Sequence, residues 1–192
     1  MSGSRPRRIP GRSRMTRAAV AAILRDGTQG AELLLVQRAR RVGDPWSGDM
    51  AFPGGRQQAE DRNTLETAMR ETSEETGLAL EPAACLGRLS DVVTRKHEHW
   101  RPMVVTPWLF RIEERPDWQL NHELTSQVWV PLSFLMDTRN RERMRWKLGP
   151  VKVNAPCYHY QDYRIWGLTL MMIDGLLRLL DPSASRSSQR SR

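Results

Sequence analysis

The chain has 192 residues, 39% of them hydrophobic, which suffices for one well-buried core and is rather short for two. Its formal net charge of +8 would suggest a nucleic-acid-binding face if it were spread over the surface. However, residues 1–16 hold five Arg and residues 182–192 hold three, without any acid, so the body is formally neutral. We expect one domain over 17–180 between a disordered basic tail (1–16) and a disordered Ser/Arg tail (181–192), with no specific nucleic acid as partner.

The cysteine content and the N-terminal segment bear on the compartment. Cys85 and Cys157 are too few and too far apart for a disulfide scaffold, and no secretory apolar run precedes them. We therefore expect a cytoplasmic protein. The first residues are rich in Arg and Ser, as in mitochondrial transit peptides, but Pro6 and Pro10 would break the amphipathic helix of such a peptide. Met15 lies where the regular pattern begins, which leaves a downstream start as an alternative.

The first predicted elements are a β-hairpin and a short strand. Apolar runs at 17–24 and 31–37 flank turn residues, which predicts the hairpin. Residues 39–47 are polar and contain Gly and Pro, so we expect a loop before a short strand at 49–52. A helix is expected over 64–76.

The second half of the chain alternates apolar segments with charged connections. The basic run 138–147 is expected to be a loop or a frayed helix, either a solvated face or an attractor of an anionic substrate. Residues 165–180 are very apolar but shorter than the ~20 residues of a membrane span, which predicts a core helix and no membrane partner, and leaves a homodimer interface open. The remaining expectations are strands at 85–93, 103–112, 126–130 and 151–163 and a short helix at 132–136. This order predicts a mixed α/β fold.

The helix at 64–76 has clear start and stop signals. Asn63 can cap its N-terminus, and Glu66 can complete a capping box. Gly77 suits the left-handed conformation that ends a helix. Leu65, Ala68, Met69 and Thr72 follow the spacing of a buried stripe.

Three carboxylates share another face of this helix. Glu71, Glu74 and Glu75 stand at positions i, i+3 and i+4, where like charges repel. A divalent cation would relieve the repulsion, and Glu oxygens suit Mg²⁺ or Mn²⁺, which typically also bind substrate phosphates. The alternative is a solvated acidic face with Arg70 as an ion-pair partner.

The surrounding residues resemble the Nudix box. Its second half is matched by Arg70-Glu71-Thr72-Ser73-Glu74-Glu75-Thr76-Gly77-Leu78, with Thr72 in a usually apolar position. Its first half departs, because Arg62 stands where the box has Glu, with Asp61 and Glu60 as the nearest acids. Asp61 preceded by Phe52-Pro53-Gly54-Gly55 is similar to the coenzyme A pyrophosphatase branch of the Nudix hydrolases. Further similarity covers roughly residues 17–180, although Gly43 replaces an Arg of the signature and the segment 38–48 is one residue longer.

The resemblance implies a Nudix-type α/β/α sandwich with a mixed sheet and hydrolysis of the diphosphate of coenzyme A or acyl-CoA to adenosine 3′,5′-bisphosphate and a 4′-phosphopantetheine product. Alternatives are a pyrophosphatase for a dinucleotide or nucleotide sugar, a non-catalytic nucleotide-binding regulator, and RNA binding through the Arg tails. Glu71, Glu74 and Glu75 would hold the metal with the carbonyl of Gly54 or Gly55.

Several residues are candidates for the remaining roles. The resemblance implies that Arg70 pairs with Asp61 or Glu60 and fixes the loop, and we place it with Glu74 among the catalytic residues. Glu123 is a candidate metal ligand or general base, or else a surface residue. Arg can bind phosphate in a bidentate manner and Trp can stack on a base. The predicted substrate-binding residues are Arg38, Arg40, Arg41 and Trp46.

Overall fold

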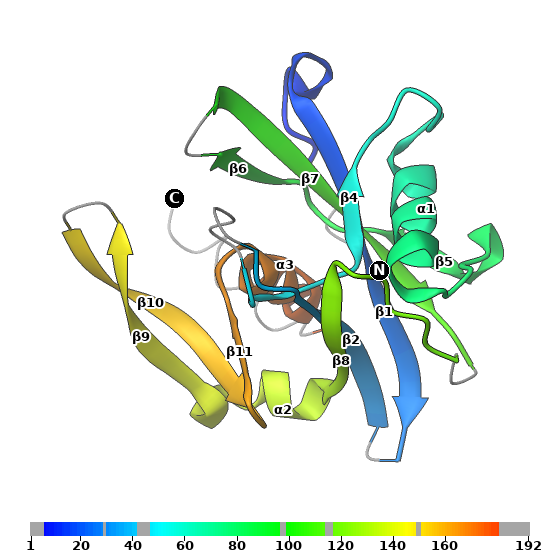
Figure 1. Ribbon diagram of the computed structural model, residues 1–192. Coiled ribbons are helices and arrows are strands. Elements are labelled where there is room, and N and C mark those ends of the chain that lie inside the picture. The colour runs from blue at the N-terminus through cyan, green and yellow to red at the C-terminus, as the bar shows by residue number, and fades with distance from the viewer. Residues whose placement is uncertain are drawn as a thin grey trace.

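A computed structural model of the chain describes residues 6–28, 30–41, 47–96, 99–113, 117–148 and 151–180 (Figure 1). The helices are α1 (Thr64–Thr76), α2 (Leu132–Met136) and α3 (Gly167–Leu180), with short 3-10 turns at Arg12–Arg14, Pro82–Ala84 and Thr138–Asn140. The strands are β1 (Thr16–Gly27), β2 (Gly30–Arg38), β3 (Met50–Ala51), β4 (Gly54–Arg56), β5 (Cys85–Arg88), β6 (Val92–Lys96), β7 (His99–Arg111), β8 (Leu124–Pro131), β9 (Arg141–Leu148), β10 (Val151–Tyr160) and β11 (Tyr163–Trp166).

The main sheet has eight strands and is mixed. Its central order is β3-β2-β1-β7-β5, while β4 also pairs with β1, β6 with β7 and β8 with β2. β1 and β7 run parallel, and the other pairs are antiparallel. The predicted hairpin is confirmed by β1 and β2, and the short predicted helix by α2.

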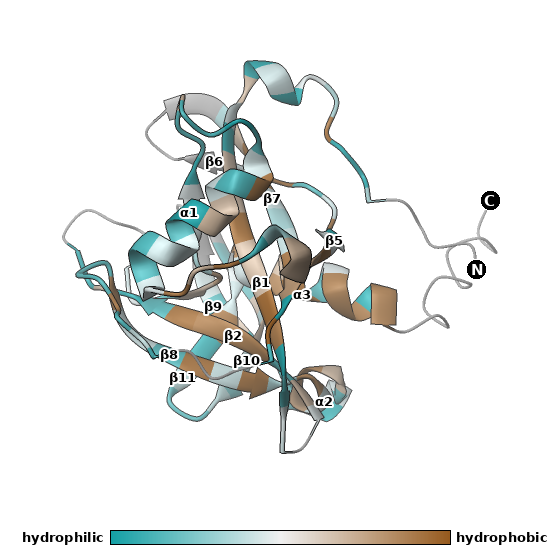
Figure 2. Ribbon diagram, turned by 90° about the vertical axis from the view of Figure 1, so that its right-hand side faces the viewer, coloured by the Kyte–Doolittle hydropathy of each residue, from teal (hydrophilic) through white to brown (hydrophobic). Residues whose placement is uncertain are grey.

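The central strand β1 is buried on both faces, which creates two core layers. Ala19, Ala21 and Ile23 pack with Ala68 of α1, whereas Ala18 and Ala22 belong to a second cluster that includes residues of α2 and α3. The small side chains of β1 let α1 approach the sheet closely, and Ala68 is fully buried. Figure 2 shows hydrophobic residues along β1 and β2 and a largely hydrophilic α1. The predicted α/β/α sandwich is therefore confirmed.

A second, three-stranded sheet corrects the prediction for residues 138–147. Its order is β11-β10-β9, so most of the basic run is a strand rather than a loop or frayed helix. Arg143 and Arg145 are exposed, while Met144 and Trp146, which alternate with them, are half-buried, as in a strand with two different faces. β9 and β10 project from the body of the molecule (Figure 1).

The N-terminal segment is held against the main sheet. The Ile9 amide donates to Asp91 Oδ2 at 3.1 Å, and Arg12 forms an ion pair with the same carboxylate at 3.0 Å. The Arg7 amide donates to Ser90 Oγ at 3.0 Å. Residues 6–16 are thus part of the folded domain, and the prediction of a disordered tail over 1–16 is corrected for this part. Residues 1–5 and 181–192 lie outside the described residues.

Several element boundaries differ from the predictions; β7, for example, begins at His99 and not at 103. The predicted strand at 85–93 is two strands, β5 and β6, which pair with different parts of β7. The predicted strand at 151–163 ends at Tyr160, and the terminal helix begins at Gly167, because residues 163–166 pair with β10. Within the described part of the chain, none of the helices has the length and apolar character to cross a membrane.

Candidate active site

Both ends of α1 are fixed by local signals. Asn63 Oδ1 accepts hydrogen bonds from the amides of Leu65 and Glu66 at 2.8 and 3.1 Å, as predicted for a cap. Gly77 has a φ of 74° and its amide donates to Ser73, which confirms the predicted helix end. The capping box is not formed, because the Glu66 carboxylate accepts from the amide and side chain of Arg62 instead.

The buried face of α1 differs in part from the predicted stripe. Ala68 and Thr72 are fully buried, whereas Leu65 and Met69 are half-buried. The Thr72 hydroxyl donates to the Ala68 carbonyl at 2.7 Å, so this polar residue is satisfied within the helix where the Nudix box usually has an apolar one.

Glu75 is buried and points to the glycines that precede the helix. Its Oε2 accepts a hydrogen bond from the Gly54 amide at 2.9 Å, and 6% of the residue is exposed. Burial raises the pKa of this carboxyl to about 7, while the Gly54 amide and the positive charge of Arg38 act in the opposite direction. Helical spacing alone had placed Glu75 with Glu71 and Glu74 on a polar face, and did not predict its burial.

Close approach of the backbone requires glycine at position 54, and position 55 lies against a side chain of α1. Gly54 has a φ of 147°, and a Cβ there would collide with the backbone of β1 at Ala19 and Val20. A Cβ on Gly55 would lie 2.5 Å from the carboxyl carbon of Glu71. The side chains of Glu71 and Glu75 therefore lie directly beside the Gly54-Gly55 backbone.

Arg70 connects the helix to the preceding loop. Its guanidinium donates to both oxygens of Asp61 at 2.9 and 3.0 Å, to Glu71 at 2.9 Å and to Glu74 at 3.0 Å. Of the two acids predicted as its partner, the structure selects Asp61, whose side chain is 4% exposed. Arg70 lowers the pKa of Asp61 to about 2, and Asp61 in turn raises the pKa of Arg70. Desolvation raises the pKa of Glu71, although Arg70 opposes this shift.

Asp61 also organises the loop between β4 and α1. Its Oδ2 accepts hydrogen bonds from the Gln58 amide and the Thr67 hydroxyl at 2.9 and 3.0 Å. The role of Thr67 was not predicted, since a single buried Thr on a helix carries no sequence signal for such a contact.

The predicted substrate-binding residues lie on the strand end and loop after β2. The Arg38 amide donates to the Asp49 carbonyl at 3.1 Å, which closes the loop at its base. Arg41 pairs with Glu123 at 3.2 Å, and both side chains are exposed. The side chain of Arg40 lies 3.7 Å from the position a Cβ would take on Gly48. Trp46 lies outside the described residues, as does Gly43.

Glu123 is electrostatically linked to the buried carboxylate. Its charge contributes to the raised pKa of Glu75, which indicates that the two groups lie in the same region. The structure thus brings Glu71, Glu74, Glu75, Arg70 and Gly55 together, with Arg38 and Glu123 beside them.

The donor set fits a divalent cation, but in this structure the carboxylates are not gathered around one point. Among the described residues no three His, Cys, Asp or Glu side chains are arranged to hold a metal ion. Glu71 and Glu74 are instead both bonded to Arg70. The described carboxylates Asp61, Glu71, Glu74 and Glu75 nevertheless outnumber the guanidinium groups of Arg70 and Arg38, and hard oxygen donors suit Mg²⁺ or Mn²⁺. Glu71, Glu74 and Glu75 with the Gly55 carbonyl are the residues that could hold it.

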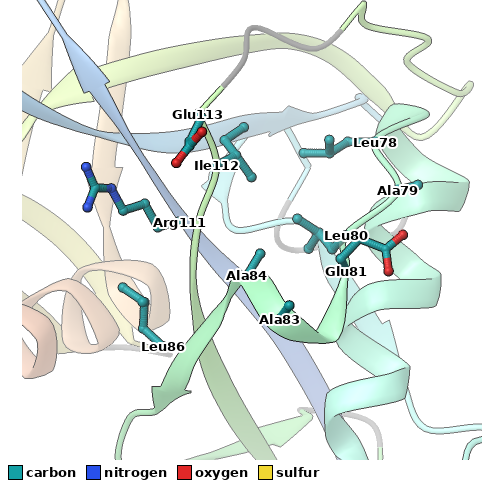
Figure 3. A pocket seen from close by; sticks show the side chains of 10 residues that line it. All are labelled: Leu78, Ala79, Leu80, Glu81, Ala83, Ala84, Leu86, Arg111, Ile112 and Glu113. Carbon is teal, nitrogen blue, oxygen red and sulfur yellow. The ribbon is translucent and has the colours of Figure 1, made fainter.

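An open depression of about 640 Å³ lies elsewhere on the molecule. It is lined by residues that follow α1 and by residues at the end of β7, including Leu78, Leu80 and Ile112 (Figure 3). None of the carboxylates described above lines it. We therefore place the candidate active site at the Gly54-Gly55 turn and not in this depression.

Comparisons with known proteins agree with the geometry. The family model for the NUDIX domain matches residues 15–148. The chain is 30% identical over 175 residues to the human mitochondrial coenzyme A diphosphatase NUDT8, covering 89% of this chain and 72% of that protein. It is 29% identical over 153 residues to the mouse protein of the same name, covering 78% of this chain and 71% of that protein.

Solved structures support the same fold. A MutT/nudix family protein from Enterococcus faecalis superposes with a TM-score of 0.60 at 19% identity, covering 91% of this chain and 66% of that one. The NUDIX domain of Shewanella oneidensis NrtR, complexed with ADP ribose, gives 0.59 at 16% identity over 87% and 89%. Because the family model spans more than half of the sequence and the human relative is matched over most of its length, this chain belongs to the Nudix hydrolase family of pyrophosphohydrolases.

Proposed function

We propose that this Nudix hydrolase cleaves the diphosphate of coenzyme A or an acyl-CoA with the help of Mg²⁺ or Mn²⁺. The observation that carries the proposal is the packing of Glu71 and Glu75 against the Gly54-Gly55 turn, with Arg70 and Asp61 fixing the loop that leads into α1. The similarity to coenzyme A diphosphatases over most of the chain supports the choice of substrate. Nudix hydrolases generally need divalent metal ions, in agreement with the surplus of carboxylates.

The reaction is a hydrolysis of one phosphoanhydride bond. The oxygen of water forms a bond to one phosphorus, the bridging P–O bond breaks, and the bridging oxygen leaves with the other phosphate. The protons of the water pass to a base or to solvent. The products are adenosine 3′,5′-bisphosphate and 4′-phosphopantetheine, or its acylated form.

The residues of the candidate site are proposed to have different roles in this reaction. Glu71, Glu74 and Glu75 provide negative charge for the cation, which when bound neutralises the diphosphate and lowers the pKa of a water molecule. Arg70 acts through Asp61 as a positioning residue that holds the loop against α1. Glu123, which pairs with Arg41, would act as the general base or add a further carboxylate ligand once that ion pair opens.

Arg38, Arg40 and Arg41 are proposed to attract the phosphates of the substrate. A charge-assisted hydrogen bond to phosphate is worth about 1.5–3 kcal/mol, so loss of the 3′-phosphate should lower kcat/KM roughly ten- to a hundredfold. Dephospho-coenzyme A is therefore expected to be the poorer substrate.

A substrate panel tests the proposal. We would measure kcat/KM for coenzyme A, dephospho-coenzyme A, NADH and ADP-ribose with Mg²⁺ and with Mn²⁺, and identify the products by mass. Coenzyme A should be the best of the four and give adenosine 3′,5′-bisphosphate. A more than tenfold preference for NADH or ADP-ribose would refute the coenzyme A assignment and favour another nucleoside diphosphate-linked substrate, whereas no turnover of any of them would favour a nucleotide-binding regulator.

A further inference from the structure

We infer that the projecting sheet β9–β11 carries an aromatic platform for the phosphorylated nucleoside end of the substrate. The platform consists of Trp146 on β9 and Trp166 on β11, whose ring centroids lie 4.2 Å apart at an interplanar angle of 49°. Both residues are half-buried. This inference rests on the proposed function and specifies one part of the same site.

The two faces of the β9–β10 hairpin have different chemistry. Arg143, Arg145 and Asn154 are exposed on one face, whereas Met144, Trp146 and Val153 on the other are half-buried. The second group lies on the same face as Trp166. Trp166 pairs with Cys157, which is an even number of residues from Val153 on β10, and Val153 pairs with Trp146. At its Trp166 end, this apolar, aromatic face contacts the main sheet through Asp49.

Hydrogen bonds connect the platform to the substrate loop. Trp166 Nε1 donates to Asp49 Oδ1 at 2.8 Å, and the Asp49 carbonyl accepts from the Arg38 amide at 3.1 Å. Asp49 stands five residues before Gly54, at the start of the segment that leads into the Gly54-Gly55 turn. Trp166 is therefore bonded to the segment that connects the substrate loop with the Gly54-Gly55 turn.

The charged side chains beside the platform indicate which part of the substrate would bind there. The guanidinium of Arg164 lies 5.7 Å from the centre of the Trp166 ring and has no ion-pair partner within the part of the chain that the structure describes. Arg40 lies over Gly48, next to Asp49. The two carboxylates at this face are bonded within the protein, Asp49 to Trp166 and Glu142 to His159. An acyl chain or pantetheine arm would not interact with the two cations, whereas a purine with a phosphate on its ribose matches both the aromatic surface and the positive charge.

Binding of the two reaction products separates this role from a purely structural one. We would measure dissociation constants for adenosine 3′,5′-bisphosphate and for 4′-phosphopantetheine by calorimetry, using full-length wild-type protein, Trp146→Leu and Trp146→Phe. Stacking on an aromatic side chain is worth about 1–3 kcal/mol per base, so Trp146→Leu should weaken the bisphosphate about five- to a hundredfold. Binding of 4′-phosphopantetheine should change less than about twofold by the same reasoning, and Trp146→Phe should restore most of the lost affinity.

The matched control is Asn154→Ala, on the opposite face of the hairpin, which should leave both dissociation constants unchanged. Equal weakening of both products by Trp146→Leu, or no weakening of the bisphosphate, would overturn the platform. A wild-type protein that binds no adenosine 3′,5′-bisphosphate would overturn it too. Hydrolysis of coenzyme A by the same wild-type sample reports on the proposed function separately.

Discussion

Two arginine–carboxylate clusters of this protein differ in the balance of their charges. Around Asp91, two guanidinium groups, from Arg12 and Arg88, surround one fully buried carboxylate, which also accepts from the Thr106 hydroxyl at 2.8 Å. Every polar atom of this carboxylate is bonded within the protein. The cluster connects the N-terminal segment and the β5–β6 connection to β7. Its carboxylate charge is balanced within the protein.

The cluster at α1 has the opposite balance. One guanidinium, that of Arg70, is shared by Asp61, Glu71 and Glu74, and the buried Glu75 lies nearby. Burying negative charge without a partner is costly, and in the described part of the chain two guanidinium groups, those of Arg70 and Arg38, lie near four carboxylates. The comparison teaches that the sign of the charge imbalance, more than the presence of ion pairs, separates the candidate metal-binding cluster from the structural one.

The largest expected effect is on catalysis at the acidic cluster. Glu75→Gln keeps an oxygen that can accept from the Gly54 amide but removes the charge, so turnover should fall by about a hundredfold or more. The melting temperature in metal-free buffer should stay the same or rise, because a buried ionised carboxylate is lost. Steady-state kinetics and thermal unfolding would measure the two quantities. Glu81→Gln, an exposed residue after α1, is the control, and equal activity of both variants would exclude Glu75 from the mechanism.

Asp91→Asn should affect stability instead. The change leaves Arg12 and Arg88 without their carboxylate, and breaking such a buried pair costs about 3–5 kcal/mol. Urea unfolding should show this loss, while kcat of the folded fraction should remain near the wild-type value. A large fall in kcat without a fall in stability would show that the Asp91 cluster contributes to catalysis and not only to stability.

Arg70→Ala should lower both activity and stability. Asp61 would remain buried without its guanidinium, which costs about 2–3 kcal/mol, and the loop before α1 would lose its anchor. Arg70→Lys keeps the charge but cannot bind both oxygens of Asp61 in the same way, so it should fall between wild type and Ala. Thermal unfolding orders the three proteins. An unchanged melting temperature in Arg70→Ala would show that the pair with Asp61 does not stabilise the fold.

The same ion pair predicts a dependence of stability on pH. The folded-state pKa of Asp61 is lowered to about 2 from an ordinary value of 3.8, so its contribution is fully present above pH 3.8 and is lost as pH falls through about 2. The shift corresponds to about 2 kcal/mol. Urea unfolding of wild type and Asp61→Asn should therefore differ most at pH 5 and converge towards pH 2. A difference that stays constant over this range would contradict the assigned pKa.

The features that sequence could predict are those with local signals. Helix α1 has the predicted bounds because Asn63 and Gly77 act within a few residues of its ends. The carboxylate cluster also follows from spacing on one helix. The burial of Glu75 could not be predicted in this way, because it depends on Gly54, 21 residues earlier in the chain.

Features that depend on distant partners were missed for the same reason. In β9 the exposed Arg143 and Arg145 obscured the alternation with Met144 and Trp146, and the strand forms because β10 and β11 supply its neighbour and the Trp166 ring. The composition of the N-terminal segment is typical of a disordered tail, but Arg12 forms a hydrogen bond with Asp91, 79 residues later in the chain. Neither contact has a signal within a local window of sequence.

The central claim is that the surplus of carboxylates at α1 holds a divalent cation, and metal binding tests it most directly. Calorimetric titration of metal-free protein with Mn²⁺ would be compared for wild type, Glu75→Gln and the exposed control Glu81→Gln. The account predicts saturable binding by wild type and Glu81→Gln and a dissociation constant at least about tenfold weaker for Glu75→Gln, by loss of one charged ligand. Equal Mn²⁺ affinity in all three proteins would contradict it.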